Sequence, residues 1–262
     1  MKQKMIDIMH RFQHYNSDNM AYLAFGLDKS IVYDALVVAP SYTPYKFKLE
    51  ETCKVTTLKE GSYIAGYMVE KDGLKIAWIK FGSSDSNIID HVAICAELQF
   101  KKMIFIGAVG ALKPEFELGD ICTPLYSIAG SYAHTYLKES IRNYVPFEKV
   151  EPNMTFVNEV IEVGDSAGIS IKKASVFCTA SIALEYYHLD EIKEFGTDLI
   201  EMETASFYLM ADLMEVPSVA LLVVSDNSAT NTALVGRTEE QQRRYYAGFN
   251  QLAQMIFNIA NM

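Results

Sequence analysis

The segment Lys102-Met103-Ile104-Phe105-Ile106-Gly107-Ala108-Val109-Gly110-Ala111-Leu112 decides the fold, because an unbroken apolar run in it ends in glycines and small residues. The run from Met103 to Ile106 shows no alternation of apolar and polar residues, which is typical of a central strand covered by helices on both faces. The glycines predict that the strand ends at Gly107 and Ala108 and opens backbone space for a small ligand, with a plain tight turn as the alternative. The GxxG spacing differs from the GxGxxG of a dinucleotide-binding turn, so we expect no NAD site here.

Strand and helix patterns alternate on both sides of this segment. Apolar, β-branched runs predict strands at Ile31–Ala39, Tyr63–Val69, Leu74–Ile79, Lys102–Ile106, Asp120–Thr123, Ile169–Cys178, Leu199–Met202 and Ser218–Ser225. Periodicity and capping signals predict helices at Ser86–Leu98, Thr155–Ala167, Tyr186–Phe195 and Glu203–Glu215, and a last one that begins at Thr238. This order indicates an α/β fold with a mixed or largely parallel central sheet flanked by helices.

The composition of the 262-residue chain is that of a globular protein, with 50% hydrophobic and 21% charged residues. No linker divides it, so we expect one domain over residues 1–262, with residues 1–30 as an N-terminal extension. The 33 acidic residues exceed the 23 basic ones and give a formal net charge of −10, which argues against nucleic acid as a partner. Without a signal-peptide core or a membrane-length apolar run, the chain is expected to be cytoplasmic and without membrane contact.

Two further predicted strand ends carry carboxylates, at the edge where α/β sheets bind their ligands. Glu201 and Glu203 flank Met202, and a carboxylate at such a position can accept hydrogen bonds from the vicinal hydroxyls of a ribose. The alternative for Glu203 is a first-turn helix residue that favours the helix dipole. Asp226 follows an apolar strand, so burial is expected to raise its pKa and make it a general acid, with an N-cap or Asx-turn as the alternative.

Three segments in this order resemble the superfamily of purine nucleoside phosphorylases, uridine phosphorylases and methylthioadenosine/S-adenosylhomocysteine nucleosidases. They are Lys102–Ile121, Ile200–Ser206 and Val219–Asp226. The resemblance implies a three-layer nucleoside phosphorylase-like fold and cleavage of the N-glycosidic bond of a purine-type nucleoside. It also implies no metal and no organic cofactor, inorganic phosphate as co-substrate if the enzyme is a phosphorylase, and a homo-oligomer, either a dimer, a trimer or a hexamer.

The resemblance assigns roles to the carboxylates. Glu203 would hold the ribose hydroxyls, with Met202 packed on the sugar and Glu201 beside them. Asp226 would be the general acid to the departing base. Arg237, eleven positions after Asp226, is placed to reach back and position that acid, although a solvated arginine at a helix start is an equal alternative.

The phosphate region of the chain departs from the phosphorylase pattern. Phe105 and Ala108 stand where phosphorylases carry an arginine and often a serine or threonine that bind phosphate. Around Gly107 and Ala108, only Lys46 offers a positive charge, and Ser83 offers a hydroxyl. The leading hypothesis is therefore a superfamily enzyme with an open choice of nucleophile. A nucleosidase that uses water and a non-catalytic nucleoside-binding protein are the alternatives.

Overall fold

The computed structural model describes all 262 residues of the chain. Its strands form one ten-stranded sheet, in which parallel and antiparallel pairs are mixed, and a separate two-stranded pair. The strands are β1 (Val32–Tyr33), β2 (Ala35–Val38), β3 (Lys54–Lys59), β4 (Ala65–Lys71), β5 (Leu74–Lys80), β6 (Gln99–Phe100), β7 (Met103–Ala111), β8 (Ile121–Ala129), β9 (Glu148–Val150), β10 (Ile171–Cys178), β11 (Leu199–Glu201) and β12 (Ser218–Asn227). The predicted mixed α/β fold is confirmed.

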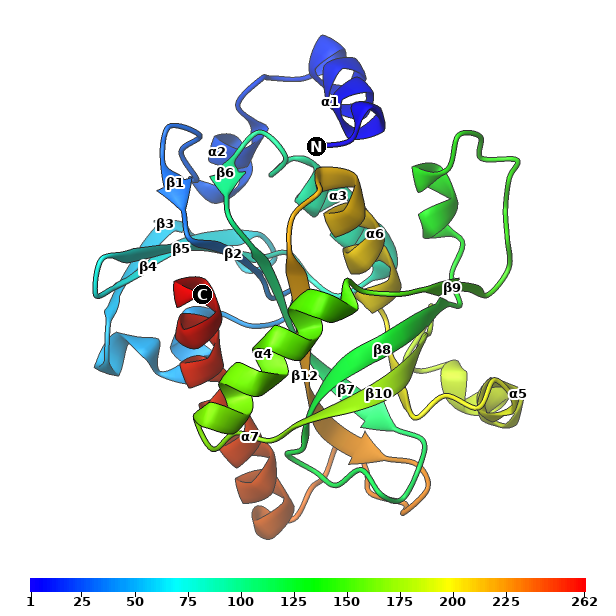
Figure 1. The fold of residues 1–262 in the computed structure, drawn as a ribbon. Coiled ribbons are helices and arrows are strands. Elements are labelled where there is room, and N and C mark those ends of the chain that lie inside the picture. Colours follow the sequence, from blue (N-terminus) through cyan, green and yellow to red (C-terminus); the bar gives the residue numbers. More distant parts are fainter.

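Helices cover both faces of this sheet (Figure 1). The α-helices are α1 (Gln3–Tyr15), α2 (Met20–Phe25), α3 (Asp85–Ala93), α4 (Met154–Ser166), α5 (Leu189–Glu194), α6 (Thr204–Met214) and α7 (Glu239–Asn261), and the 3-10 helices are η1 (Pro44–Phe47), η2 (Leu49–Glu51), η3 (Ala133–Leu137) and η4 (Glu185–His188). On one face, Met103 and Phe105 of β7 pack with α3 and α6. On the other, Ile104 and Ile106 pack with α4 and α7, as the lack of alternation predicts.

Half of the sheet closes on itself. Strands β11, β10, β8, β12 and β7 are neighbours in that order, and β11 also pairs with β7. This closure places Gly110 of β7 between two partners, because Ile200 pairs with it from β11 and Asp226 from β12. The two strand ends that carry the predicted site carboxylates therefore flank one glycine.

The glycines of β7 are inside the strand, so both the predicted strand end at Gly107 and the tight-turn alternative are wrong. The strand continues to Ala111. A Cβ atom added at Gly107 would lie 2.7 Å from the ring of Phe105, and one added at Gly110 would lie 3.0 Å from Oδ2 of Asp226. The small residues thus serve packing within the sheet and leave space for the Asp226 carboxyl.

Residues 1–30 form α1 and α2, which the sequence patterns did not predict. Met5 and Phe25 from these helices are fully buried in the same core as β7. The capping signal at Thr238 is confirmed and forms a capping box, because the Thr238 and Gln241 side chains each accept a hydrogen bond from the other residue's backbone N–H. Helix α4 ends at Ser166, one residue before the end predicted from the sequence. None of the helices is both long and apolar enough to span a lipid bilayer.

Candidate active site

A cavity of ≈ 190 Å³ lies at the carboxyl ends of the central strands. The segments after β2, β5 and β10 form its wall together with β7 and the ends of β11 and β12. The predicted site residues that line it are Ser83, Gly107, Ala108, Glu201, Met202, Glu203 and Asp226. Residues from the middle and the end of the chain thus meet in one space of small-molecule size.

Asp226 lies where the register between β12 and β7 shifts, directly opposite Gly110. The Ser225 hydroxyl donates a hydrogen bond of 2.6 Å to its Oδ1. Burial raises the pKa of Asp226, against the opposing effects of the Ser225 hydrogen bond and the Arg237 charge. A carboxyl group that keeps its proton toward neutral pH is a usable general acid.

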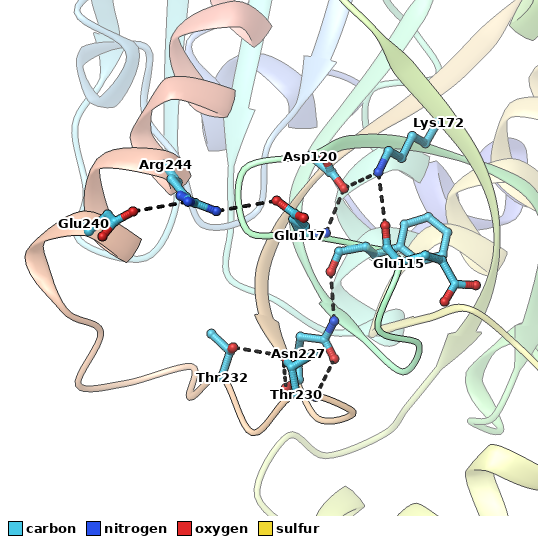
Figure 2. A network of polar contacts seen from close by, with 10 residues as sticks. Glu115, Glu117, Asp120, Lys172, Asn227, Thr230, Thr232, Glu240 and Arg244 are labelled. Atoms are coloured by element: carbon cyan, nitrogen blue, oxygen red, sulfur yellow. Dashed lines mark hydrogen bonds and ion pairs between the residues drawn. The ribbon is translucent and has the colours of Figure 1, made fainter.

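Asn227, not Asp226, makes the Asx-turn that the sequence allowed at this strand end. Its Oδ1 accepts from the N–H groups of the next turn, and its Nδ2 donates to the carbonyl of Phe116 at 2.8 Å. Figure 2 shows Asn227 in the same network of polar contacts as the ion pair of Lys172 with Asp120, in which Nζ and Oδ2 are 2.6 Å apart. These bonds hold the loop after β7 against the end of β12, so the backbone that follows Asp226 is fixed.

Glu201 and Glu203 have diverged in role. The Glu201 carboxylate is fully used by four donors: the N–H groups of Glu203 (2.7 Å) and Thr204 (3.0 Å), the Thr204 hydroxyl (2.8 Å) and the Cys178 thiol (2.8 Å). It therefore caps α6, which is the role proposed as the alternative for Glu203. Glu203 makes no side-chain capping bond, and its buried Oε1 has no partner in the chain.

Burial and the neighbouring Glu201 charge raise the pKa of Glu203 well above its ordinary value. Burial also raises the pKa of Glu201, but its four donors oppose that rise. Of the two carboxyls, Glu203 is therefore the one whose charged form the protein opposes more strongly. A ligand that donates hydrogen bonds, such as a sugar diol, would satisfy the free oxygen of Glu203.

The side of the cavity expected to hold the nucleophile is built from hydroxyl groups. The Ser41 and Ser83 hydroxyl oxygens are 2.7 Å apart, and those of Tyr42 and Tyr245 are 3.2 Å apart. No lysine, arginine or histidine is among the lining residues, and the ionisable acids are Glu185, Glu201, Glu203 and Asp226. The wall thus offers carboxyls and neutral hydroxyls but no cation.

The two predicted basic residues lie outside the lining. The Lys46 ammonium is 3.3 Å from the Tyr246 hydroxyl and lies over the ring of that tyrosine. The Arg237 guanidinium lies over the Tyr245 ring, and its Nε donates to the carbonyl of Ser225 at 2.8 Å. Arg237 is therefore behind the cavity wall, close enough to Asp226 to affect its pKa.

Glu185 is a site residue that the sequence patterns missed. It is the first residue of η4, is only 9% exposed and lines the cavity. Burial and the charge of Asp226 raise its pKa to about 7. A carboxylate beyond the end of β10 is the same signal that marked Asp226, but Glu185 stands seven residues after Cys178, directly before the predicted helix Tyr186–Phe195.

Comparisons with known proteins agree with this geometry. The profile of the phosphorylase superfamily matches residues 35–257. A DeoD-type purine nucleoside phosphorylase of Shewanella oneidensis is 27% identical over 219 residues, covering 81% of this chain and 86% of the relative. An aminodeoxyfutalosine nucleosidase of Campylobacter jejuni is also 27% identical, over 194 residues, with coverages of 71% and 81%. The structure of uridine phosphorylase from Vibrio fischeri superposes with a TM-score of 0.73 at 14% identity, covering 90% of this chain and 95% of that one. The chain belongs to the phosphorylase superfamily, which contains both nucleoside phosphorylases and nucleosidases.

Proposed function

We propose that this protein hydrolyses the N-glycosidic bond of a purine-type nucleoside, with water rather than phosphate as the nucleophile. The observation that carries the proposal is the charge of the cavity, whose lining holds four carboxyl groups and no basic side chain. Phosphate is an anion at neutral pH, and burying an anion beside carboxylates without a cation is strongly unfavourable. Water has no such cost, and hydroxyl groups can hold it.

Asp226 is the proposed general acid. As the bond between C1′ and the base nitrogen breaks, its electron pair moves to the base, and the Asp226 proton neutralises the charge that develops there. The sugar gains positive charge, and water adds its oxygen to C1′. The proton that water loses balances the proton that Asp226 gives, and solvent reprotonates Asp226 for the next cycle.

Glu203 is the proposed ribose anchor, with Met202 against the sugar. Its unpartnered Oε1 supports this role, because two vicinal hydroxyls can donate to one carboxylate. The Ser41 and Ser83 hydroxyls are the proposed cradle of the attacking water. Glu201, placed beside the ribose by the resemblance, acts in this proposal through the helix start that carries Glu203.

Base release is expected to be independent of phosphate. The protein is incubated with a panel of nucleosides in phosphate-free buffer and in phosphate, and base, ribose and ribose 1-phosphate are quantified. Equal rates with free ribose as the sugar product support hydrolysis. Formation of ribose 1-phosphate only with phosphate present would establish the phosphorylase alternative, and tight nucleoside binding without base release would establish the binding-protein alternative.

The predicted homo-oligomer remains a prediction, and an exposed aromatic surface supports it. The segment between β8 and β9 carries four aromatic side chains that are each between 42% and 63% exposed: Tyr132, Tyr136, Tyr144 and Phe147. Two of them, Tyr132 and Tyr136, line a hollow together with Thr179 and Met202, which also line the active-site cavity. Aromatic residues gathered on a surface are typical of subunit contacts. Sedimentation equilibrium is expected to give the mass of a dimer, a trimer or a hexamer of the 29.5 kDa chain. The mass of a single chain at high protein concentration would contradict this prediction.

A further inference from the structure

We propose that the hollow lined by Tyr132 and Tyr136, beside the active-site cavity, binds a positively charged amino group carried on the 5′ side of the nucleoside. The inference rests on the proposed function, since it assumes that Asp226 faces the base and Glu203 the ribose diol. It deepens that function by naming the class of nucleoside that the site prefers. Cationic 5′ substituents are favoured over neutral and anionic ones.

The hollow is continuous with the active-site cavity. It has a volume of ≈ 530 Å³ and shares Thr179 and Met202 with the cavity. The two spaces also meet at consecutive residues, because Ser83 lines the cavity and Ser84 lines the hollow. The base and the diol of a nucleoside bound as proposed point to carboxyls that line the cavity and not the hollow. The 5′ substituent is the remaining branch of the sugar, so the hollow next to Met202 is the space into which it can extend.

The lining of the hollow combines carboxyl groups with aromatic rings. Asp85 and Asp90 line it with Tyr132, Tyr136 and three serines, and no lysine, arginine or histidine is among its lining residues. The Tyr132 and Tyr136 rings lie edge to face, with centroids 6.3 Å apart and an interplanar angle of 87°. Aromatic faces attract ammonium groups, and the carboxyls add opposite charge. An anionic substituent would instead meet two carboxyls with no counter-ion among the lining residues.

Asp85 is the polar group of the hollow that lacks a hydrogen-bond partner. It is only 7% exposed, its Oδ2 accepts a hydrogen bond from the Ser131 hydroxyl, and its buried Oδ1 has no partner in the chain. Helix α3 does not need this carboxyl as a cap, since the Ser84 hydroxyl accepts from the N–H of Asn87 at 3.1 Å. A carboxylate that only favours a helix dipole can do so from the surface. The burial of Asp85 beside a hollow therefore points to a ligand that donates to it.

The surroundings of Asp85 do not supply that donor. Burial raises the pKa of Asp85, and the Ser131 hydrogen bond and the His134 charge oppose the rise. His134 is fully buried and lines neither space, and its Nε2 is 3.3 Å from the carbonyl oxygen of Val145. An ammonium group in the hollow would stabilise the ionised carboxyl, whereas a neutral group of the same shape would leave the cost of burying that charge in place. The hollow is therefore expected to distinguish a cation from a neutral isostere.

The test compares matched pairs of adenosines substituted at the 5′ oxygen. One member carries an aminoalkyl chain with a tether of two to four carbons, and in the other a methyl group replaces the ammonium. Dissociation constants are measured by calorimetry on Asp226→Asn, which is expected to bind nucleosides without cleaving them. At the best tether length, the amine is expected to bind roughly 10- to 100-fold more tightly than its alkyl counterpart, because a primary amine is charged at neutral pH. A 5′-O-carboxyalkyl adenosine is expected to bind most weakly.

Two variants of the hollow are made in the Asp226→Asn background. Asp85→Asn can still accept the Ser131 hydrogen bond but carries no charge, so the preference for the amine is expected to fall to about threefold or less. Tyr136→Leu changes a side chain that is 63% exposed and is expected to reduce the preference roughly 2- to 5-fold. Asp190→Asn is the matched control, because it also removes a first-turn aspartate, but an exposed one on α5 that lines neither space.

An amine that binds no more tightly than its alkyl counterpart at every tether length overturns the inference. A preference that is unchanged in both Asp85→Asn and Tyr136→Leu also overturns it. The proposed hydrolysis is judged separately, by base release from adenosine in phosphate-free buffer. If base release requires phosphate, the proposed nucleophile is wrong, and the binding ratios still decide the inference. Absence of binding by every nucleoside rejects both.

Discussion

Asp226→Asn is expected to lower the rate of base release by roughly 10²- to 10⁴-fold, the usual cost of removing a general acid. The asparagine amide occupies nearly the same volume and can still accept the Ser225 hydrogen bond, so the fold around Gly110 is expected to persist. The amide cannot release a proton to the base. Turnover within a few-fold of wild type would remove Asp226 from the mechanism.

A substrate whose leaving group needs no proton separates acid catalysis from binding. A nitrophenyl riboside releases a stabilised phenolate, so Asp226→Asn is expected to cleave it nearly as fast as the wild type does. The purine nucleoside and the nitrophenyl riboside share the ribose, and both depend on Glu203. Equal losses on the two substrates would show that the variant damages the site as a whole.

The pH profile gives a second readout of the same acid. Activity is expected to fall as pH rises through the pKa of Asp226, because the reactive form is protonated. The Arg237 charge lowers that pKa, so Arg237→Gln is expected to move the falling limb of the profile to higher pH. Arg237→Lys keeps the charge and is expected to move it less. A uniform loss of rate with an unmoved limb would give Arg237 a purely structural role.

The sequence alone was sufficient to predict the strands that carry the site. An apolar strand that ends in a carboxylate is a local pattern, and Glu203 and Asp226 both line the cavity as their positions suggested. The central strand was also recognisable, because Met103 to Ile106 are buried on both faces. These features depend on neighbouring residues, which periodicity describes well.

Features that depend on distant contacts were not predictable. The glycines of β7 resembled a turn because the pairing partners that keep them in a strand, Ile200 and Asp226, are far away in sequence. Lys46 looked like a phosphate ligand because only the folded chain brings Tyr246 to it. Glu185 could not be recognised as a site residue for the same reason. Its charge interacts with that of Asp226 only because β10 and β12 both belong to the closed half of the sheet.

Glu203→Gln is expected to lower kcat/KM for ribonucleosides by roughly 10²- to 10⁴-fold. Two hydroxyls that donate to Glu203 stabilise its ionised form, and hydrogen bonds to a charged group contribute about 1.5–3 kcal/mol each. The same variant is expected to change activity on 2′,3′-dideoxynucleosides much less, since these substrates lack the hydroxyls. Measuring both substrates on both proteins isolates the coupling between Glu203 and the diol. Equal losses on the two substrates would place Glu203 outside ribose recognition.

Glu203→Gln is expected to be more stable than the wild type, although it is less active. Glu203 has a raised pKa, so the folded protein binds a proton that the unfolded chain gives up above about pH 4.5, the ordinary value. This linkage lowers the free energy of unfolding increasingly as pH rises above that value. Glu203→Gln removes this pH-dependent loss of stability. The melting temperature of the variant is therefore expected to exceed that of the wild type by an amount that grows with pH and vanishes in acid.

Glu201→Gln is the matched comparison two residues away, and it is expected to destabilise the fold by about 3 kcal/mol or more. Its carboxylate accepts from four donors, and an amide nitrogen would turn a donor toward those of Glu203, Thr204 or Cys178. Glu203→Gln is thus expected to lower activity and raise stability, whereas Glu201→Gln is expected to lower stability. If both variants lose stability equally, the Glu203 carboxyl is held by the fold rather than kept free for a ligand. A buried oxygen without a partner persists at a site where function requires it, and the diol of the substrate is the partner that would complete it.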